Sequence, residues 1–185
     1  MVQVRRQRFT VKEYYKMAEV GILKPTDKVE LINGEIIQMS PTKSPHASAI
    51  TTLHELLIEQ LFKQVTIRNQ QPIQINKHSE PEPDIAVVLH RKDRYKYNHP
   101  NPSETLLVVE VSDSTLKYDK TVKKLLFAKA NIPEYWIINI PDSQIEVFKK
   151  PVNGDYEEAL IYRDKEVIKT EKVKFQISVD DIFFD

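Results

Sequence analysis

Three short apolar runs, rich in β-branched and aromatic residues, constrain the fold of this chain more than any other feature. They are Asp84–Leu89 (DIAVVL), Thr105–Val111 (TLLVVEV) and Glu134–Ile140 (EYWIINI). Continuous runs of this length are typical of strands that are covered on both faces of a sheet. Helical patterns precede and separate these runs. The sequence therefore predicts an α/β (α+β) fold, with a central mixed β-sheet flanked by helices.

The other elements follow from local signals. Helices are predicted over Phe9–Leu23, where Thr10 and Glu13 have the spacing of a capping box, over Ser44–Gln64, and over Tyr118–Ala130. Asn33-Gly34 is a strong two-residue turn signal and predicts a hairpin over Val29–Met39. Further strands are predicted over Thr66–Ile75, Gln144–Lys149 and Tyr156–Thr170.

Length and composition exclude several classes of protein. The chain has 185 residues without a repeat or a Gly/Ser-rich linker, so we expect one domain over residues 1–185. It contains no cysteine, which excludes disulfide scaffolds, thiolate metal sites and cysteine nucleophiles. No apolar run is as long as a bilayer span, and the N-terminus lacks the apolar core of a signal peptide. We therefore expect a cytoplasmic protein without a membrane partner.

Two carboxylates stand at unusual positions. Glu110 interrupts an apolar strand, and Asp84 begins another directly after Glu82-Pro83. A carboxylate in a buried strand is costly unless it is paired or binds a cation. Each acid also has a simpler interpretation, since Glu110 can be a strand-end acid bound to a lysine and Asp84 can belong to a turn. Together, on adjacent strand ends, they would form a site of hard oxygen ligands that suits Mg²⁺ or Mn²⁺.

The helix that follows Glu110 contains several lysines, of which Lys123 is best placed to reach these acids. Asp119, Lys123 and Phe127 follow i, i+4 spacing along the flank of its apolar face. Lys120 and Lys124 point largely to the opposite side, as solvated charges. The simpler role for Lys123 is an ion pair with Asp119.

Asp84, Glu110 and a following lysine resemble the PD-(D/E)xK nuclease superfamily. The sequence is more closely similar to a large bacterial family of putative restriction endonucleases within that superfamily. The matching blocks span about residues 9 to 150 and are ELINGEI (30–36), MSP (39–41), His46, EPDIAVV (82–88), VVEVSDSTLKYD (108–119), Lys123 and IPEYWIIN (132–139). One position departs from the superfamily pattern. Ser112 stands where the superfamily usually has its lysine, and Lys123 on the next helix matches the place of that lysine.

The resemblance implies a restriction-endonuclease-like core and a metal-dependent endonuclease that hydrolyses phosphodiester bonds in DNA, with Mg²⁺ or Mn²⁺ as cofactor. It implies that Asp84 and Glu110 bind the metal, with the Val111 carbonyl and Glu30 as further contacts. Lys123 would orient the attacking water or neutralise charge on the phosphate. Glu30 has an equally common alternative as a half-exposed strand acid.

Several basic residues are candidates for binding DNA. The loop after DIAVVL contains Arg91, Lys92 and Arg94, and the third helix contributes Lys120. His46 is a further candidate for phosphate contact, although a packed or capping histidine is the more common case. For each basic cluster a solvated surface is the simpler interpretation. The chain carries 27 basic and 27 acidic residues, which disfavours a globally basic nucleic-acid coat protein.

Two further expectations concern partners and activity. By analogy with nucleases that cut both strands, a homodimer is expected, with the C-terminal strands between Tyr156 and Phe184 supplying an edge. The alternative function is a catalytically inactive nuclease-like module that binds nucleic acid or protein. The replacement at Ser112 and the balanced net charge favour that alternative. We assign Tyr135 and Trp136 to the core rather than to base stacking.

Overall fold

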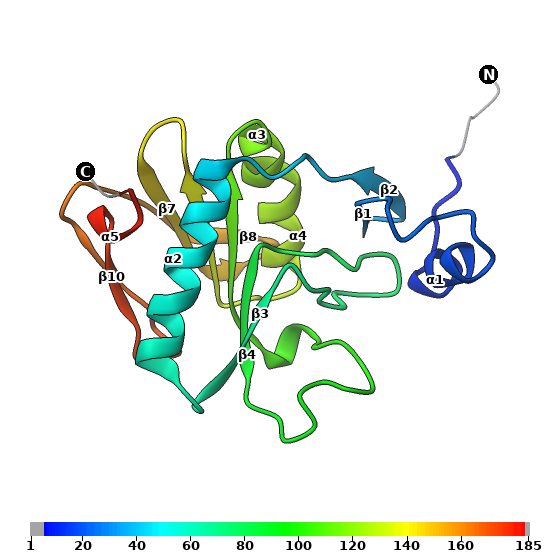
Figure 1. Cartoon of the computed structure of the whole chain (residues 1–185), viewed down its shortest axis with the longest axis horizontal. Coiled ribbons are helices and arrows are strands. Elements are labelled where there is room, and N and C mark those ends of the chain that lie inside the picture. The colour runs from blue at the N-terminus through cyan, green and yellow to red at the C-terminus, as the bar shows by residue number, and fades with distance from the viewer. Residues whose placement is uncertain (1–5, 184–185) are drawn as a thin grey trace.

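A six-stranded mixed sheet organises the protein, seen here in a computed structural model that describes residues 6–183 (Figure 1). The strand order is β3-β4-β5-β6-β7-β8, and only β5 and β6 run parallel. The strands of this sheet are β3 (Val65–Asn69), β4 (Ile85–Leu89), β5 (Thr105–Ser112), β6 (Glu134–Asn139), β7 (Gln144–Val152) and β8 (Asp155–Arg163). This architecture confirms the predicted fold class.

Helices and two small hairpins surround the sheet. The helical segments are α1 (Val11–Glu19), α2 (Ser44–Leu61), η1 (Pro102–Glu104), α3 (Leu116–Tyr118), η2 (Asp119–Lys123), α4 (Lys124–Lys129) and α5 (Asp180–Phe183). The hairpins pair β1 (Val29–Ile32) with β2 (Glu35–Gln38), and β9 (Val167–Lys169) with β10 (Gln176–Ser178). A parallel strand pair needs a crossover connection, and the continuous helical segment α3–η2–α4 provides it between β5 and β6.

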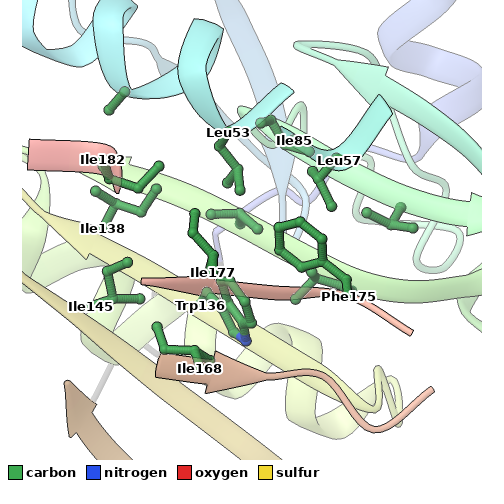
Figure 2. Packing of buried hydrophobic residues seen from close by; sticks show 14 of the residues in the cluster. Leu53, Leu57, Ile85, Trp136, Ile138, Ile145, Ile168, Phe175, Ile177 and Ile182 are labelled. Atoms are coloured by element: carbon green, nitrogen blue, oxygen red, sulfur yellow. The ribbon is translucent and has the colours of Figure 1, made fainter. Parts of the chain in front are cut away.

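Both faces of the sheet are covered, as the apolar runs predicted. On one face, α2 and the β9–β10 hairpin cover a cluster that contains Trp136, whose ring centroid lies 6.2 Å from that of Phe175, with Ile168 and Ile177 beside the indole (Figure 2). On the other face, α4 packs over Tyr135, whose ring centroid lies 5.1 Å from that of Phe127. Tyr135 and Trp136 are fully buried, which confirms that both belong to the core. Adjacent strand residues point to opposite faces, so the pair contributes to both apolar layers.

Local chemistry explains where the first elements begin and end. The capping box between Thr10 and Glu13 is present, and α1 starts at Val11 rather than Phe9. It ends at Glu19 instead of Leu23, shortly before Gly21, which has a φ of +78°. The hairpin turns at Asn33 and Gly34 as predicted, with φ values of +52° and +80°. Both residues adopt the positive φ that a tight hairpin turn requires.

Three further predicted boundaries were wrong. The strand predicted over Thr66–Ile75 ends at Asn69, because Gln70 has a φ of +47° and Pro72 follows. Helix α2 ends at Leu61 rather than Gln64. The segment predicted over Tyr156–Thr170 divides into β8 and β9 near Asp164, which has a φ of +49°, and β9 leaves the central sheet to pair with β10. Phe184, the end of the predicted edge segment, lies outside the described residues.

No helix within residues 6–183 is long and apolar enough to cross a membrane.

Candidate active site

The pairing of β4 with β5 brings Asp84 next to Glu110. The two strands are antiparallel, and Ile85 is the register partner of Val109, so Asp84 and Glu110 are the next residues along this pair. The side chain of Asp84 is also bonded to the backbone of β5, because the Val111 N–H donates to Asp84 Oδ2 at 2.8 Å. Asp84 and Glu110 are both buried. The structure thus brings the two acids to one end of a strand pair, where the sequence predicted them.

Lys123 reaches the same point from the crossover helix. Its Nζ lies 2.9 Å from Glu110 Oε1 and 3.1 Å from Glu30 Oε1. Glu30 comes from β1, and its second oxygen accepts the Glu82 N–H at 3.1 Å. Lys123 therefore bridges two carboxylates, and Glu30 is buried rather than half-exposed. The simpler role for Lys123, an i, i+4 pair with Asp119, is not what the structure shows, because its ion-pair partners are Glu110 and Glu30.

A π-helical turn over Asp119–Lys123 shapes this part of the crossover. Asp119 is buried, and its Oδ2 accepts a 2.7 Å hydrogen bond from Ser112 Oγ, at the end of β5. Ser112 thus ties the turn to the strand that bears Glu110. Single π-turns within α-helices are frequent at functional sites. Both Asp119 and Lys123 face inward from this turn and are buried.

The side chain of Asp84 has two further neighbours. His46, in the first turn of α2, places its Nε2 3.2 Å from Asp84 Oδ2. Gln70 Nε2 donates to Asp84 Oδ1 at 3.3 Å. His46 is therefore neither a capping histidine nor one packed only among apolar side chains, since its imidazole lies beside Asp84. The Nδ1 atom of His46 is buried without a hydrogen-bond partner.

Burial and the crowding of acids set the protonation of the site. Burial raises the pKa of Glu110, as do the charges of Asp84 and Asp119, and these effects outweigh the opposing charge of Lys123. Burial lowers the pKa of Lys123, but Glu110 and Glu30 raise it above its ordinary value, so the amine stays protonated. For His46, burial lowers the pKa, and the hydrogen bond and charge of Asp84 outweigh that effect and raise it.

The acids of the site and His46 line a cavity of about 500 Å³, whereas Lys123 is not among its lining residues. The lining acids include Glu30, Asp84, Glu110 and Asp119. Residues that flank the β1–β2 hairpin and the start of α3 complete the lining. Figure 1 shows the chain passing from β2 to α2 beside α3, across this end of the sheet. Val111, the predicted carbonyl ligand, also lines the cavity.

A complete metal-ligand cluster is not preformed in the described part of the chain. Within residues 6–183, no three His, Asp or Glu side chains are grouped closely enough to hold a metal ion by themselves. Mg²⁺ is usually bound through only one or two carboxylates, with waters and substrate phosphates completing its shell. The oxygen donors of Asp84, Glu110 and the Val111 carbonyl are of the type that this ion prefers. The donor set therefore fits a divalent metal that shares its coordination with substrate.

The residues predicted to bind nucleic acid are scattered. Lys120 Nζ lies 2.7 Å from Glu146 Oε2, so its charge is already paired. Arg91, Lys92 and Arg94 follow the far end of β4, separated from Asp84 by the five residues of that strand, or about 17 Å. Arg91 is bound to Asp93 and Glu104, at 2.6 and 3.3 Å. Of the predicted group, only His46 lies beside the acids.

Sequence reasoning missed two residues of the site. Gln70 lies in the segment predicted as a strand, so nothing marked it. Asp119 was noted only as a partner for Lys123. A signal for Asp119 did exist, since it shares an i, i+4 flank with Lys123 beside an apolar face, where an acid needs a buried partner.

Comparison with known proteins places these features in context. The family whose model matches residues 11–180 is described as "Uma2: Putative restriction endonuclease". A crystal structure titled as a putative nuclease belonging to DUF820, from Anabaena variabilis ATCC 29413, is similar to this chain with a TM-score of 0.71 and 17% identity, covering 95% of this chain and 98% of that one. At this identity the likeness shows a shared fold. No curated protein matches the chain.

Proposed function

The chain belongs to the Uma2 family of putative restriction endonucleases, and on that premise we propose that it is a metal-dependent endonuclease that hydrolyses phosphodiester bonds in DNA. The family match over residues 11–180 confirms the resemblance that the sequence motifs indicated. We propose the metal, the substrate and the roles of individual residues in addition to the family match.

The observation that carries the proposal is an excess of buried negative charge. Four carboxylates line one cavity and are buried: those of Glu30, Asp84, Glu110 and Asp119. Lys123 pairs with two of them, Glu30 and Glu110, and His46 lies 3.2 Å from Asp84, so the acids outnumber the basic groups that contact them. Buried charge is costly unless it is compensated. A divalent cation at Asp84 and Glu110 would supply the missing positive charge, and Mg²⁺ or Mn²⁺ suits their oxygen atoms.

The proposed reaction is hydrolysis. A water oxygen adds to phosphorus, one P–O bond to a sugar breaks, and the products are a phosphate monoester and a free hydroxyl that takes up a proton. A divalent ion bound by Asp84, Glu110 and the Val111 carbonyl would supply Lewis-acid polarisation of the phosphate and a more acidic water. Glu30 contributes indirectly, because it helps to hold the Lys123 amine beside Glu110.

Lys123 is proposed to act on the phosphate or the attacking water. Its amine is protonated and held by Glu30 and Glu110, which line the cavity, so it would supply a fixed positive charge next to the acids where negative charge would develop on phosphoryl oxygens. Stabilisation by a preorganised charge in a site that excludes water is worth more than the same charge in solution. The superfamily usually has a lysine at the position of Ser112. The position of the Lys123 amine beside Glu110 supports the proposal that Lys123 replaces that lysine.

The proposal is tested by nicking of supercoiled plasmid with Mg²⁺ or Mn²⁺. We expect the wild-type protein to nick and Asp84→Asn, Glu110→Gln and Lys123→Met to lose at least 100-fold in rate, as expected when a group that stabilises the transition state is removed. The matched control is Asp142→Asn, an exposed acid that does not line the cavity. Undiminished nicking by the Asp84 and Glu110 variants would reject this site. Absence of nicking and of metal binding, with DNA binding retained, would favour the inactive-module alternative.

A further inference from the structure

The depth of the acidic site limits the form of nucleic acid that can enter it. Asp84 and Glu110 line the cavity and are only 6% and 4% exposed. The cavity volume of about 500 Å³ is in the range of pockets that enclose a small molecule. A phosphate inside it must be accompanied by its own nucleoside. In a duplex, that would require the nucleotide to leave the base stack, which costs far less in a strand that is already unpaired.

The basic residues around the site point the same way. Of the two lysines that line the cavity, Lys43 is bound to Asp113 at 2.6 Å, and Lys28 forms no ion pair within residues 6–183. Outside the cavity, Lys120 is bound to Glu146, and Lys124 is bound to Asp155 at 2.8 Å. Non-specific binding of duplex DNA depends on many lysine and arginine contacts to phosphates. Basic side chains that already neutralise acids of the same protein contribute little to such a surface.

The walls of the cavity offer aromatic rings instead. Tyr118 precedes the π-turn and Tyr14 belongs to α1, and both line the cavity. The ring of Tyr14 is fixed, because its hydroxyl donates to the Val29 carbonyl at 2.9 Å. Proteins that bind single strands combine base stacking on aromatic side chains with a few backbone contacts. Tyr118 lines the same cavity as Glu30, Asp84, Glu110 and Asp119, so its ring shares that cavity with the acids.

We propose that the site takes unpaired DNA, with one nucleotide inserted in the cavity and its base stacked on Tyr118. This inference rests on the proposed endonuclease function and adds the class of substrate. It predicts that loops, flaps and single strands are cut and that continuous duplex is a poor substrate. The loop of Arg91, Lys92 and Arg94, at the far end of β4, takes no part in holding the scissile nucleotide.

The test compares two circular substrates of the same sequence, single-stranded phage DNA and its relaxed, covalently closed duplex. Both lack ends, so each scores internal cleavage. With Mn²⁺, we expect the single-stranded circle to be linearised at least tenfold faster than the duplex is nicked. Equal or faster nicking of the duplex would overturn the inference and leave the endonuclease proposal intact. If neither circle is cut, the proposed function fails and the inference falls with it.

Variants of Tyr118 test the stacking step. Tyr118→Ala should raise the KM for a single-stranded oligonucleotide at least fivefold, because base–aromatic stacking is lost. Tyr118→Phe keeps the ring and should restore a wild-type KM. Tyr97→Ala is the control, since this tyrosine is 80% exposed in the loop at the far end of β4. An unchanged KM in Tyr118→Ala, or an equal rise in Tyr118→Phe, would contradict stacking on this ring.

Discussion

The Nζ atom of Lys123 lies 2.9 Å from Glu110 Oε1, and both side chains are buried. The two residues are thirteen positions apart in sequence and belong to different elements, a π-turn and a central strand. Glu30, from the N-terminal hairpin, is the second acid on the same amine. One lysine therefore links three separate segments of the chain and holds the end of the sheet, the crossover and the hairpin together.

Removal of this amine is expected to destabilise the fold. Lys123→Ala leaves Glu110 and Glu30 buried without their common partner, and breaking a buried ion pair from one side costs about 3–5 kcal/mol. The neighbouring Lys124 pairs with Asp155, which is half-exposed, so Lys124→Ala should change stability by less than about 1 kcal/mol. Urea unfolding in the absence of metal measures both values. Equal stabilities for the two variants would show that Lys123 has no special role in the fold.

A second variant tests whether Lys123 has taken over the place of the superfamily lysine. Ser112 lies two residues after Glu110 in β5, so both side chains share one face of the strand. Lys123→Ala should abolish cleavage of single-stranded DNA, and adding Ser112→Lys should return part of it by restoring an amine beside Glu110. Activity is compared at equal folded fraction, judged by circular dichroism. A double variant that folds and binds Mn²⁺ yet stays inactive would contradict this exchange of positions.

Much of this site could be predicted because local patterns determine it. The apolar runs after Asp84 and around Glu110 predicted two buried strands, and neighbouring strands place such residues together. Lys123 could be chosen because helical periodicity separates it from Lys120 and Lys124. The partners of these residues were harder to predict. For Glu30, a metal contact and a half-exposed strand acid stayed equal alternatives, because nothing in its own segment shows that the crossover helix will cover it.

The ion pairs of the basic residues, in contrast, could not be predicted from the sequence. Lys120 has the periodicity of a solvated lysine, but β7 places Glu146 against it from twenty-six residues away. Arg91 was predicted to bind DNA, and it is instead paired with Asp93 in the same loop and with Glu104 at the end of η1. Ion pairs between distant segments depend on tertiary packing, so residue spacing alone does not reveal them. A role for Lys92 and Arg94 in DNA binding stays a prediction.

The ion pair between Lys120 and Glu146 leads us to expect that the stability of the protein depends on pH. Burial raises the pKa of Glu146, but hydrogen bonds from Lys120, Asn139 and Gln144 outweigh it and lower the pKa below the ordinary 4.5. A lowered pKa in the folded state gives stability that is present above 4.5 and is lost as the pH falls through the folded value. The stability difference between wild type and Glu146→Gln should therefore shrink as the pH falls from about 6 to about 3.

Urea unfolding across this pH series checks the prediction. The control is Glu59→Gln, the same change at an exposed acid on α2. A difference for Glu146→Gln that is independent of pH would mean that its carboxylate gains nothing from Lys120.

The most direct test of the metal site is an anomalous scattering experiment on crystals of the wild-type protein soaked in Mn²⁺. The ion should produce an anomalous peak within coordination distance of carboxylate oxygens from both Asp84 and Glu110, and the peak should vanish in Asp84→Asn crystals soaked in the same way. A well-ordered site without such a peak, or a manganese peak elsewhere on the protein only, would contradict the central claim that these two acids hold the catalytic metal.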